Sequence, residues 1–280
     1  LPKSALPNLK PLPDSVAVKN PSLRNPIPGY RTYVGKHAFN FLNVTQDFGD
    51  SIDWNFDYNG KLWTYNLCYF DFLMQPDMDA HTGTVLMEDF ASHYHTLIDG
   101  REPYPTSLRI MNWVKFCSIH KLEDRKLAAV VWTDAQSLVK RLEYHLLGNH
   151  LLENGFALLF AAVYFENPMW LARASSILQP QLTEQILADG AHFELSPMYH
   201  EVILSRLLDS INLLENNDSL KSTALLQQLK GHAHIMLGWL ATVQFSNGDV
   251  PQVNDCSTHI APEAGVIQHY AETLNVESTV

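Results

Sequence analysis

Between residues 60 and 245, runs of apolar residues spaced three and four positions apart follow one another with short breaks. Alternating strand patterns and the dipeptides of tight hairpins are scarce in this region. Short connections make successive helices antiparallel neighbours. The sequence therefore predicts an all-α fold made of helical hairpins. The eight expected helices span residues 61–74, 85–98, 107–121, 127–147, 150–165, 168–189, 196–215 and 222–245.

We expect these helices to form four hairpins that wind into an incomplete α/α toroid. A stacked solenoid is the competing arrangement, but the sequence has no fixed repeat length of the kind that solenoids show. In a toroid of alternating helix direction, the first, third, fifth and seventh helices begin at the same rim. Residues at these four starts are therefore expected to lie close together.

The expected rim gathers aromatic, amide, imidazole, guanidinium and phenol groups. Helix N-termini carry partial positive charge, which suits an anionic ligand. Aromatic faces beside polar groups are typical of sugar-binding sites. Ser107 is the expected N-cap of the third helix. The candidate residues near the starts, and in the loop after the eighth helix, are Tyr58, Trp63, Arg109, Asn112, Trp113, Asn149, His150, Glu153, Tyr199, His200, Asp249 and Asn254.

Three of these residues suggest elimination chemistry on an acidic sugar. A uronate C5 proton is too weakly acidic to be removed unless the adjacent carboxylate is neutralised or hydrogen-bonded, and the Asn149 amide can donate to it. Tyr199 can return a proton to the leaving glycosidic oxygen, or can act as the base in its phenolate form. His150 is the alternative base because its unperturbed pKa is close to neutral. Nearby His and Arg groups and helix N-termini are expected to favour the phenolate of Tyr199.

Each catalytic candidate also has a structural alternative. Asn149 could serve only as the cap of the fifth helix, and Tyr199 could pack its ring at the rim. His150 could be a core histidine. Glu153, one turn after His150, could orient that histidine or bind sugar hydroxyls, and a solvated or capping carboxylate is the alternative. His200 is expected to orient Tyr199 or to stabilise the helix start.

The substrate-binding candidates leave similar alternatives open. Arg109 could pair with a substrate carboxylate or sulfate through its planar guanidinium, or could form a salt bridge inside the fold. The aromatic candidates could stack on sugar rings, although aromatic residues on helices more often lie in the core. The polar residues of the loop after the eighth helix could bind sugar hydroxyls or simply form turns.

Composition restricts the partners. The formal net charge of -11 argues against a nucleic-acid partner, because phosphate binding requires a basic face. It argues only weakly against a sulfated polymer, since a cleft can be basic while the whole chain is acidic. No apolar run reaches the roughly 18–20 residues of a membrane span. The three cysteines lack metal-ligand spacing, and we predict no metal site.

Five motifs resemble the helical domain of heparinase II/III-like polysaccharide lyases, a group related to alginate lyases with the same toroid. The resemblance implies an α/α toroid followed by a β-sandwich, and β-elimination at a uronic acid with further histidines from the β-sandwich. It extends over roughly residues 35 to 256. The motifs are residues 62–67 (LWTYNL), 109–113 (RIMNW), 149–155 (NHLLENG), 189–200 (DGAHFELSPMYH) and 248–255 (GDVPQVND).

The expected domains follow from this resemblance and from the prolines. Residues 1–34 contain seven prolines and are expected to form an extended arm. Residues 35–256 are expected to form the lyase domain, and residues 257–280 a tail or linker toward a β-rich domain. Because no strand-rich region follows Asp255, we expect a fragment or a helical-only form. We predict no cofactor for this domain, and a structural metal in the missing β-rich domain stays open.

We therefore predict a polysaccharide lyase that acts on an acidic, uronate-containing glycan. A glycoside hydrolase is the first alternative, which requires two carboxylates such as Glu153 and Glu194, or Asp249 and Asp255. A non-catalytic glycan-binding module is the second. The chain begins at Leu1 without a signal peptide, which we interpret as a mature or trimmed form, and we expect a periplasmic or secreted protein. The polymer and the oligomeric state stay undetermined by the sequence.

Overall fold

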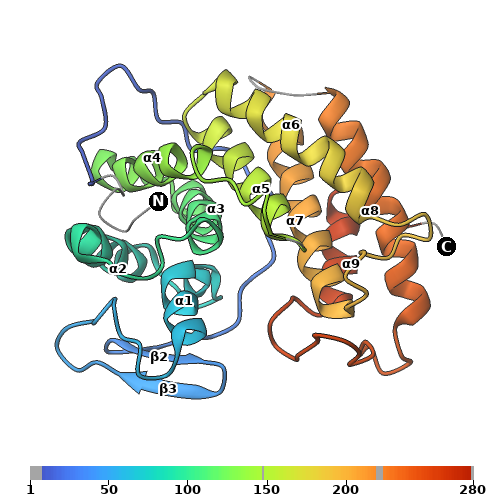
Figure 1. The fold of residues 1–280 in the computed structure, drawn as a ribbon, viewed down its shortest axis with the longest axis horizontal. Coiled ribbons are helices and arrows are strands. Elements are labelled where there is room, and N and C mark those ends of the chain that lie inside the picture. Colours follow the sequence, from blue (N-terminus) through green and yellow to red (C-terminus); the bar gives the residue numbers. More distant parts are fainter. Residues whose placement is uncertain (1–7, 147, 219–222, 279–280) are drawn as a thin grey trace. The chain divides into compact units, whose positions relative to one another are not determined.

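The computed structural model describes residues 8–146, 148–218 and 223–278. Contacts within the chain divide it into two compact units, which we describe separately (Figure 1). Unit 1 consists of Leu1–Asn20, Pro28–Glu143 and Phe160–Asn167. Unit 2 consists of Pro21–Ile27, Tyr144–Leu159 and Pro168–Val280.

Unit 1 is built around α3, which packs against α1 and α4 and is buried along most of its length. Asp79 caps α2 by accepting a hydrogen bond from the Thr82 N–H, and Asp124 caps α4 in the same way. Proline in the first turn starts α3, and Lys121 in the left-handed conformation ends it. The helices are α1 (Lys61–Tyr69), α2 (Ala80–His93), α3 (Pro103–His120) and α4 (Arg125–Val139).

A three-stranded antiparallel sheet precedes these helices, in the order β1 (Tyr33–Gly35), β2 (Ala38–Phe41) and β3 (Val44–Asp47). Phe39 pairs with Gln46, which fixes the register of the β2–β3 hairpin. The sequence did not indicate this sheet, because strands of three or four residues are too short to show alternation. The buried β2 side chains Phe39 and Phe41 contact aromatic residues of the helical core.

The described part of the proline-rich N-terminal segment has no helix or strand before Tyr33. In unit 1, the Lys19 N–H donates to the Tyr164 carbonyl at 2.8 Å. In unit 2, the Arg24 N–H and carbonyl both bind the Asn212 side chain, at 2.9 and 2.8 Å. The segment is thus held by backbone hydrogen bonds in each unit, as an extended chain can be.

Unit 2 contains the first part of α5 (His150–Tyr164), α6 (Pro168–Gln185), α7 (Pro197–Glu215), α8 (Thr223–Val243) and α9 (Ala264–Thr273). α7 packs against α8 and α9. In the region expected to be a tail, α9 buries Ile267 and Tyr270. The Tyr270 hydroxyl donates to Asp209 at 3.0 Å and accepts from Asn212 at 2.7 Å, which attaches α9 to α7.

The predicted all-α class is confirmed, and a helix is present in each of the eight expected regions. The expected cap of the third helix is wrong. α3 begins at Pro103, and the Ser107 hydroxyl lies inside the helix, where it donates to the Pro103 carbonyl at 2.8 Å. No helix in the described part of the chain is long and apolar enough to cross a membrane.

Candidate functional site

The starts of α5 and α7 both lie in unit 2, and they carry the three candidate catalytic residues. Asn149 directly precedes α5 and is 3% exposed, and His150 is the first residue of that helix. Tyr199 lies in the first turn of α7, where the Ser196 hydroxyl accepts a hydrogen bond from the Tyr199 N–H. Two helix N-termini therefore contribute to one candidate site.

The loop after α8 is fastened to the start of α7. The Ser196 hydroxyl donates to the Asp255 carbonyl at 2.8 Å, and Asn254 Nδ2 donates to the Leu195 carbonyl at 2.5 Å. The Tyr199 hydroxyl donates to Asp255 Oδ2 at 3.0 Å. These bonds hold the Asp255 carboxylate against the phenol.

A turn between α6 and α7 fastens the start of α5. Gln185 Nε2 donates to the Gly148 carbonyl at 3.2 Å, and the Asn149 N–H donates to the Glu194 carboxylate. Gly148 has φ of +86°, and a Cβ on it would lie 3.1 Å from Glu194 Oε1. The backbone conformation therefore favours glycine, and a Cβ at this position would press on the Glu194 carboxylate.

Glu194 links the two helix starts electrostatically. Its pKa is raised, first because of burial and then because of the Asp255 charge, while the Asn149 N–H and His150 oppose the rise. Burial, the hydrogen bond to Asp255 and the charges of Asp255 and Glu194 raise the pKa of Tyr199 to about 12. This direction is opposite to the one expected from the sequence. Tyr199 is therefore a phenol at neutral pH and is suited to donate a proton.

Two other candidates in unit 2 are buried. Glu153 is 0% exposed, and both of its oxygens accept from Arg206 Nε at 3.2 Å. His200 is also fully buried, where its Nε2 donates to the Met236 carbonyl at 3.1 Å and its ring packs on Trp239. Burial lowers the pKa of His200 to about 3, so it is a neutral core histidine. Neither side chain is presented at a surface.

The loop candidates have turn contacts. Asn247 Nδ2 donates to Asp249 Oδ2 at 2.6 Å, and the Asp249 N–H donates to Asn247 Oδ1 at 3.2 Å. Asn254 binds the Leu195 carbonyl, as described above. Both residues therefore shape the loop that carries Asp255, which is the turn-forming role that the sequence left open.

The candidates in unit 1 divide by exposure. Tyr58 is 91% exposed, whereas Trp63 and Trp113 lie in the aromatic core. Trp63 Nε1 donates to the Val44 carbonyl of β3 at 3.0 Å, which only the unexpected sheet makes available. Asn112 Nδ2 donates to the Tyr69 carbonyl at 2.9 Å. These two tryptophans and Asn112 are therefore buried inside unit 1. For the tryptophans, core packing is the alternative that the sequence left open.

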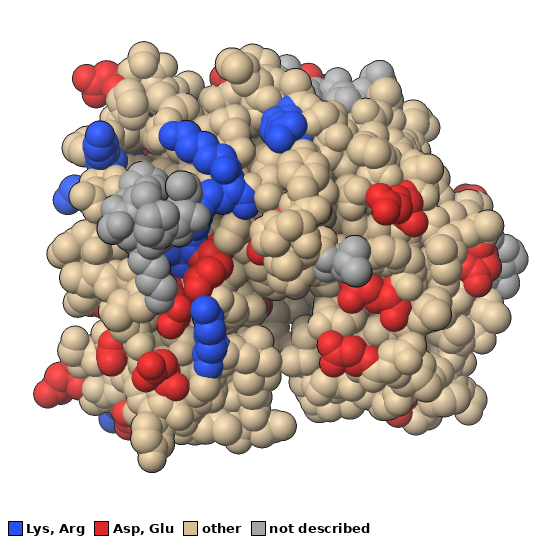
Figure 2. Space-filling model, viewed as in Figure 1, with Lys and Arg blue, Asp and Glu red and all other residues tan. Residues whose placement is uncertain are grey.

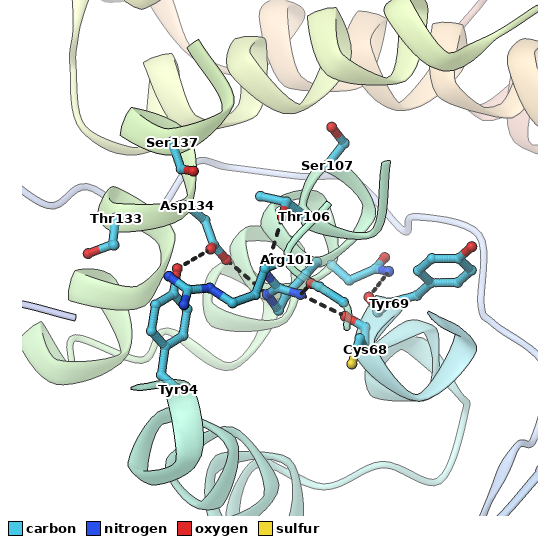
Figure 3. A network of polar contacts seen from close by, with 12 residues as sticks. Cys68, Tyr69, Tyr94, Arg101, Thr106, Ser107, Thr133, Asp134 and Ser137 are labelled. Atoms are coloured by element: carbon cyan, nitrogen blue, oxygen red, sulfur yellow. Dashed lines mark hydrogen bonds and ion pairs between the residues drawn. The ribbon is translucent and has the colours of Figure 1, made fainter. Parts of the chain in front are cut away.

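Arg109 forms the internal salt bridge that the sequence also left open. It is 1% exposed, and its Nε donates to Asp134 Oδ2 at 2.8 Å. Tyr94 donates to the other oxygen of Asp134 at 2.6 Å, and Figure 3 shows Asp134 of α4 facing this tyrosine. Arg109 Nη1 donates to the Gly100 and Cys68 carbonyls. The guanidinium therefore stabilises the core of unit 1.

Sequence reasoning missed Asp255 and Glu194 as neighbours of Tyr199 and Asn149, and it did not single out His192. The separate hairpin of residues 185–194 brings Glu194 to Gly148, which no spacing in the sequence indicates. The only local signal was Gly190 after Asp189, a turn-forming pair with φ of +92° at the glycine. Among the described residues, no three His, Cys, Asp or Glu side chains are grouped so that they could hold a metal ion.

The sequence and fold of this chain are similar to those of several known proteins. A heparin-sulfate lyase of Pedobacter heparinus is 42% identical over 57 residues, which is 19% of this chain and 9% of that protein. A crystal structure of heparinase III matches 83% of this chain and 40% of its own, at 19% identity and a TM-score of 0.61. Heparan sulfate lyase HepC from Pedobacter heparinus matches 88% and 45%, at 18% identity and a TM-score of 0.54.

The chain spans less than half the length of these relatives. At such identities the structural likeness shows the fold, and it confirms the predicted fold class. The family model described as the heparinase II/III N-terminus matches residues 106–276, which is more than half of the chain. The chain therefore belongs to the heparinase II/III family of polysaccharide lyases.

Proposed function

We propose that this chain carries the helical part of a lyase site that cleaves a uronic-acid-containing glycan by β-elimination. The observation that carries the proposal is the link between two helix starts in unit 2. The Asn149 N–H binds Glu194, and the Tyr199 hydroxyl binds Asp255, whose charge acts on Glu194. An amide, an imidazole and a protonated phenol thus belong to one connected set of residues.

The proposed reaction uses each of these groups once. The Asn149 amide donates to the uronate carboxylate and so stabilises the enolate that develops. His150 takes the C5 proton, and the C–H electron pair forms the C4–C5 double bond while the C4–O bond breaks. The Tyr199 hydroxyl gives its proton to the leaving oxygen. The raised pKa of Tyr199 supports this division, because a phenol at neutral pH is a poor base and an adequate acid.

The proposed substrate is an acidic polysaccharide, and glycosaminoglycans are the first to test because the relatives are named as heparin-sulfate and heparan sulfate lyases. The step that we assign to unit 2 uses only side chains and needs no cofactor from this domain. We further propose that the protein works in the periplasm or outside the cell, where such polymers are met.

The direct test incubates the protein with heparan sulfate, heparin, chondroitin sulfate, hyaluronan and alginate. Elimination leaves a carbon–carbon double bond that absorbs in the ultraviolet, and no water is added to the product. Mass spectrometry separates this outcome from hydrolysis, in which the products gain one water per cleavage. Hydrolysed products, or binding without cleavage of any of these polymers, would contradict the lyase proposal.

Substituting Asn149 tests its role as the carboxylate donor. We expect Asn149→Ala to lower kcat by about 10²–10³, the usual effect of removing one donor to a developing negative charge. Asn149→Asp is the matched variant, because Asp is as good an N-cap as Asn. It should abolish activity, since it brings a second carboxylate to the uronate, and the new buried charge beside Glu194 should also lower the unfolding temperature. Full activity in Asn149→Asp would instead indicate that Asn149 serves only as the N-cap of α5.

A further inference from the structure

Unit 2 carries the proposed catalytic groups but is poor in positive charge. Its sequence contains five Lys or Arg and thirteen Asp or Glu. Figure 2 shows carboxylates distributed over the surface around α8. Among the described residues, the charges that act on Glu194 are those of His150 and Asp255, with neutral Tyr199 and His192 beside it. An incoming uronate would add a third carboxylate to this set, which is unfavourable unless one of them is neutral.

The hydrogen-bond pattern beneath Glu194 fixes the proton on its neighbour His192. Gln181 Nε2 donates to Glu184, so its Oε1 is free to accept from Gln185 Nε2 at 2.9 Å. Gln185 Nε2 also donates to the Gly148 carbonyl, which leaves Gln185 Oε1 as an acceptor. The contact of 3.0 Å between this oxygen and His192 Nε2 therefore requires the hydrogen on Nε2. His192 Nδ1 is consequently an acceptor.

Two buried acceptors face each other as a result. His192 Nδ1 lies 3.8 Å from Glu194 Oε1, and neither atom has a hydrogen-bond partner among the described residues. Burial lowers the pKa of His192 to about 4, so this ring does not supply a second proton near neutral pH. An ionised Glu194 would leave both atoms as unsatisfied acceptors, which is unfavourable for atoms shielded from water. A proton on Glu194 Oε1 would replace the facing acceptors by a donor and an acceptor, and a small closing of the 3.8 Å gap would then form the hydrogen bond.

We propose that Glu194 is a further positioning residue of this site, and that it admits the anionic substrate only as a neutral carboxylic acid held toward His192. The inference rests on the proposed function and adds a specificity element to it. The neutral acid keeps the second Glu194 oxygen as an acceptor for the Asn149 N–H, so the start of α5 stays in place. The ionised form repels a uronate that approaches Asn149.

The consequence is proton-linked affinity. Below the pKa of Glu194 the acid is already neutral, and binding requires no proton. As the pH rises above that value, each binding event must take up one proton, and the Kd rises by about tenfold per pH unit. The raised pKa of Glu194 moves this loss of affinity to a higher pH than an ordinary carboxyl would give.

Calorimetric titration with a uronate-containing oligosaccharide, from about pH 5 to pH 8, tests the inference. Measurements in two buffers of different ionisation enthalpy give the number of protons taken up by the wild type, without any variant. Glu194→Gln mimics the neutral acid, because its amide can donate to His192 and accept from Asn149. We expect uptake of close to one proton by the wild type at the upper end of the range, and none by Glu194→Gln, whose Kd should change little with pH.

Glu272→Gln is the matched control, since it is the same substitution on an exposed residue of α9 in unit 2. It should retain the proton uptake and pH dependence of the wild type. Equal uptake in Glu194→Gln and the wild type, or no uptake by the wild type, would overturn the inference. The lyase proposal fails separately if the oligosaccharide binds with proton uptake but is not cleaved by elimination. Absence of binding to every variant would overturn both.

Discussion

Tyr199→Phe is expected to reduce the rate of elimination by about 10²–10⁴ while the fold is retained, because it removes the proposed proton donor and little else. The Tyr199 hydroxyl donates to Asp255, and the residue lies half-buried in the first turn of α7. Phenylalanine keeps the ring and loses one half-buried hydrogen bond, which contributes about 1 kcal/mol. The measurement is kcat at saturating uronate polymer, followed by the absorbance of the unsaturated product.

Two comparisons make this prediction specific. Tyr144→Phe changes an exposed tyrosine of the same unit and should leave kcat unchanged. A substrate with a leaving group that needs no proton should restore much of the rate of Tyr199→Phe, since only the acid is missing. Failure of that substrate to rescue the variant would indicate that Tyr199 is the base. In that case kcat of the wild type should also keep rising toward the phenol pKa of about 12.

The sequence was sufficient for the helices because their signal is local. Apolar periodicity and short connections are properties of neighbouring residues, and a helix lies in every expected region. Short elements gave no such signal. The sheet of residues 33–47 has strands of three and four residues, and α9 has only ten residues, so neither contains enough periods to be recognised. Both are held by tertiary contacts, such as those of Phe39 and Tyr270.

For single side chains of the candidate site, too, the sequence shows only what depends on neighbouring residues. The motifs around Asn149 and Tyr199 mark helix starts, and the structure places both in unit 2. Whether a side chain further along a helix is buried depends on distant partners. Asp134, 25 residues after Arg109, accepts a hydrogen bond from that guanidinium. The Val44 carbonyl accepts a hydrogen bond from the Trp63 indole. No local pattern identifies such a partner, so the sequence left both roles open.

Arg109→Leu tests directly which of its two roles Arg109 has. We expect this substitution to lower the free energy of unfolding by about 3–5 kcal/mol, because it leaves the Asp134 carboxylate buried without its cation. The Gly100 and Cys68 carbonyls also lose their donor. Equilibrium unfolding in urea measures the change. An exposed pair in the same unit supplies the control: Lys19→Leu, which breaks the contact to Glu166, should cost at most about 1 kcal/mol.

The double variant Arg109→Leu/Asp134→Asn separates an unpaired charge from lost packing. The asparagine is neutral and still offers an oxygen to the Tyr94 hydroxyl, so it removes the buried charge and keeps that hydrogen bond. Much of the stability lost in Arg109→Leu should therefore return, because the largest cost of breaking a buried pair is the charge left behind. An Arg109 that bound the substrate would behave differently. Arg109→Leu would then raise KM while the free energy of unfolding stayed near the wild-type value, and the second substitution would restore nothing.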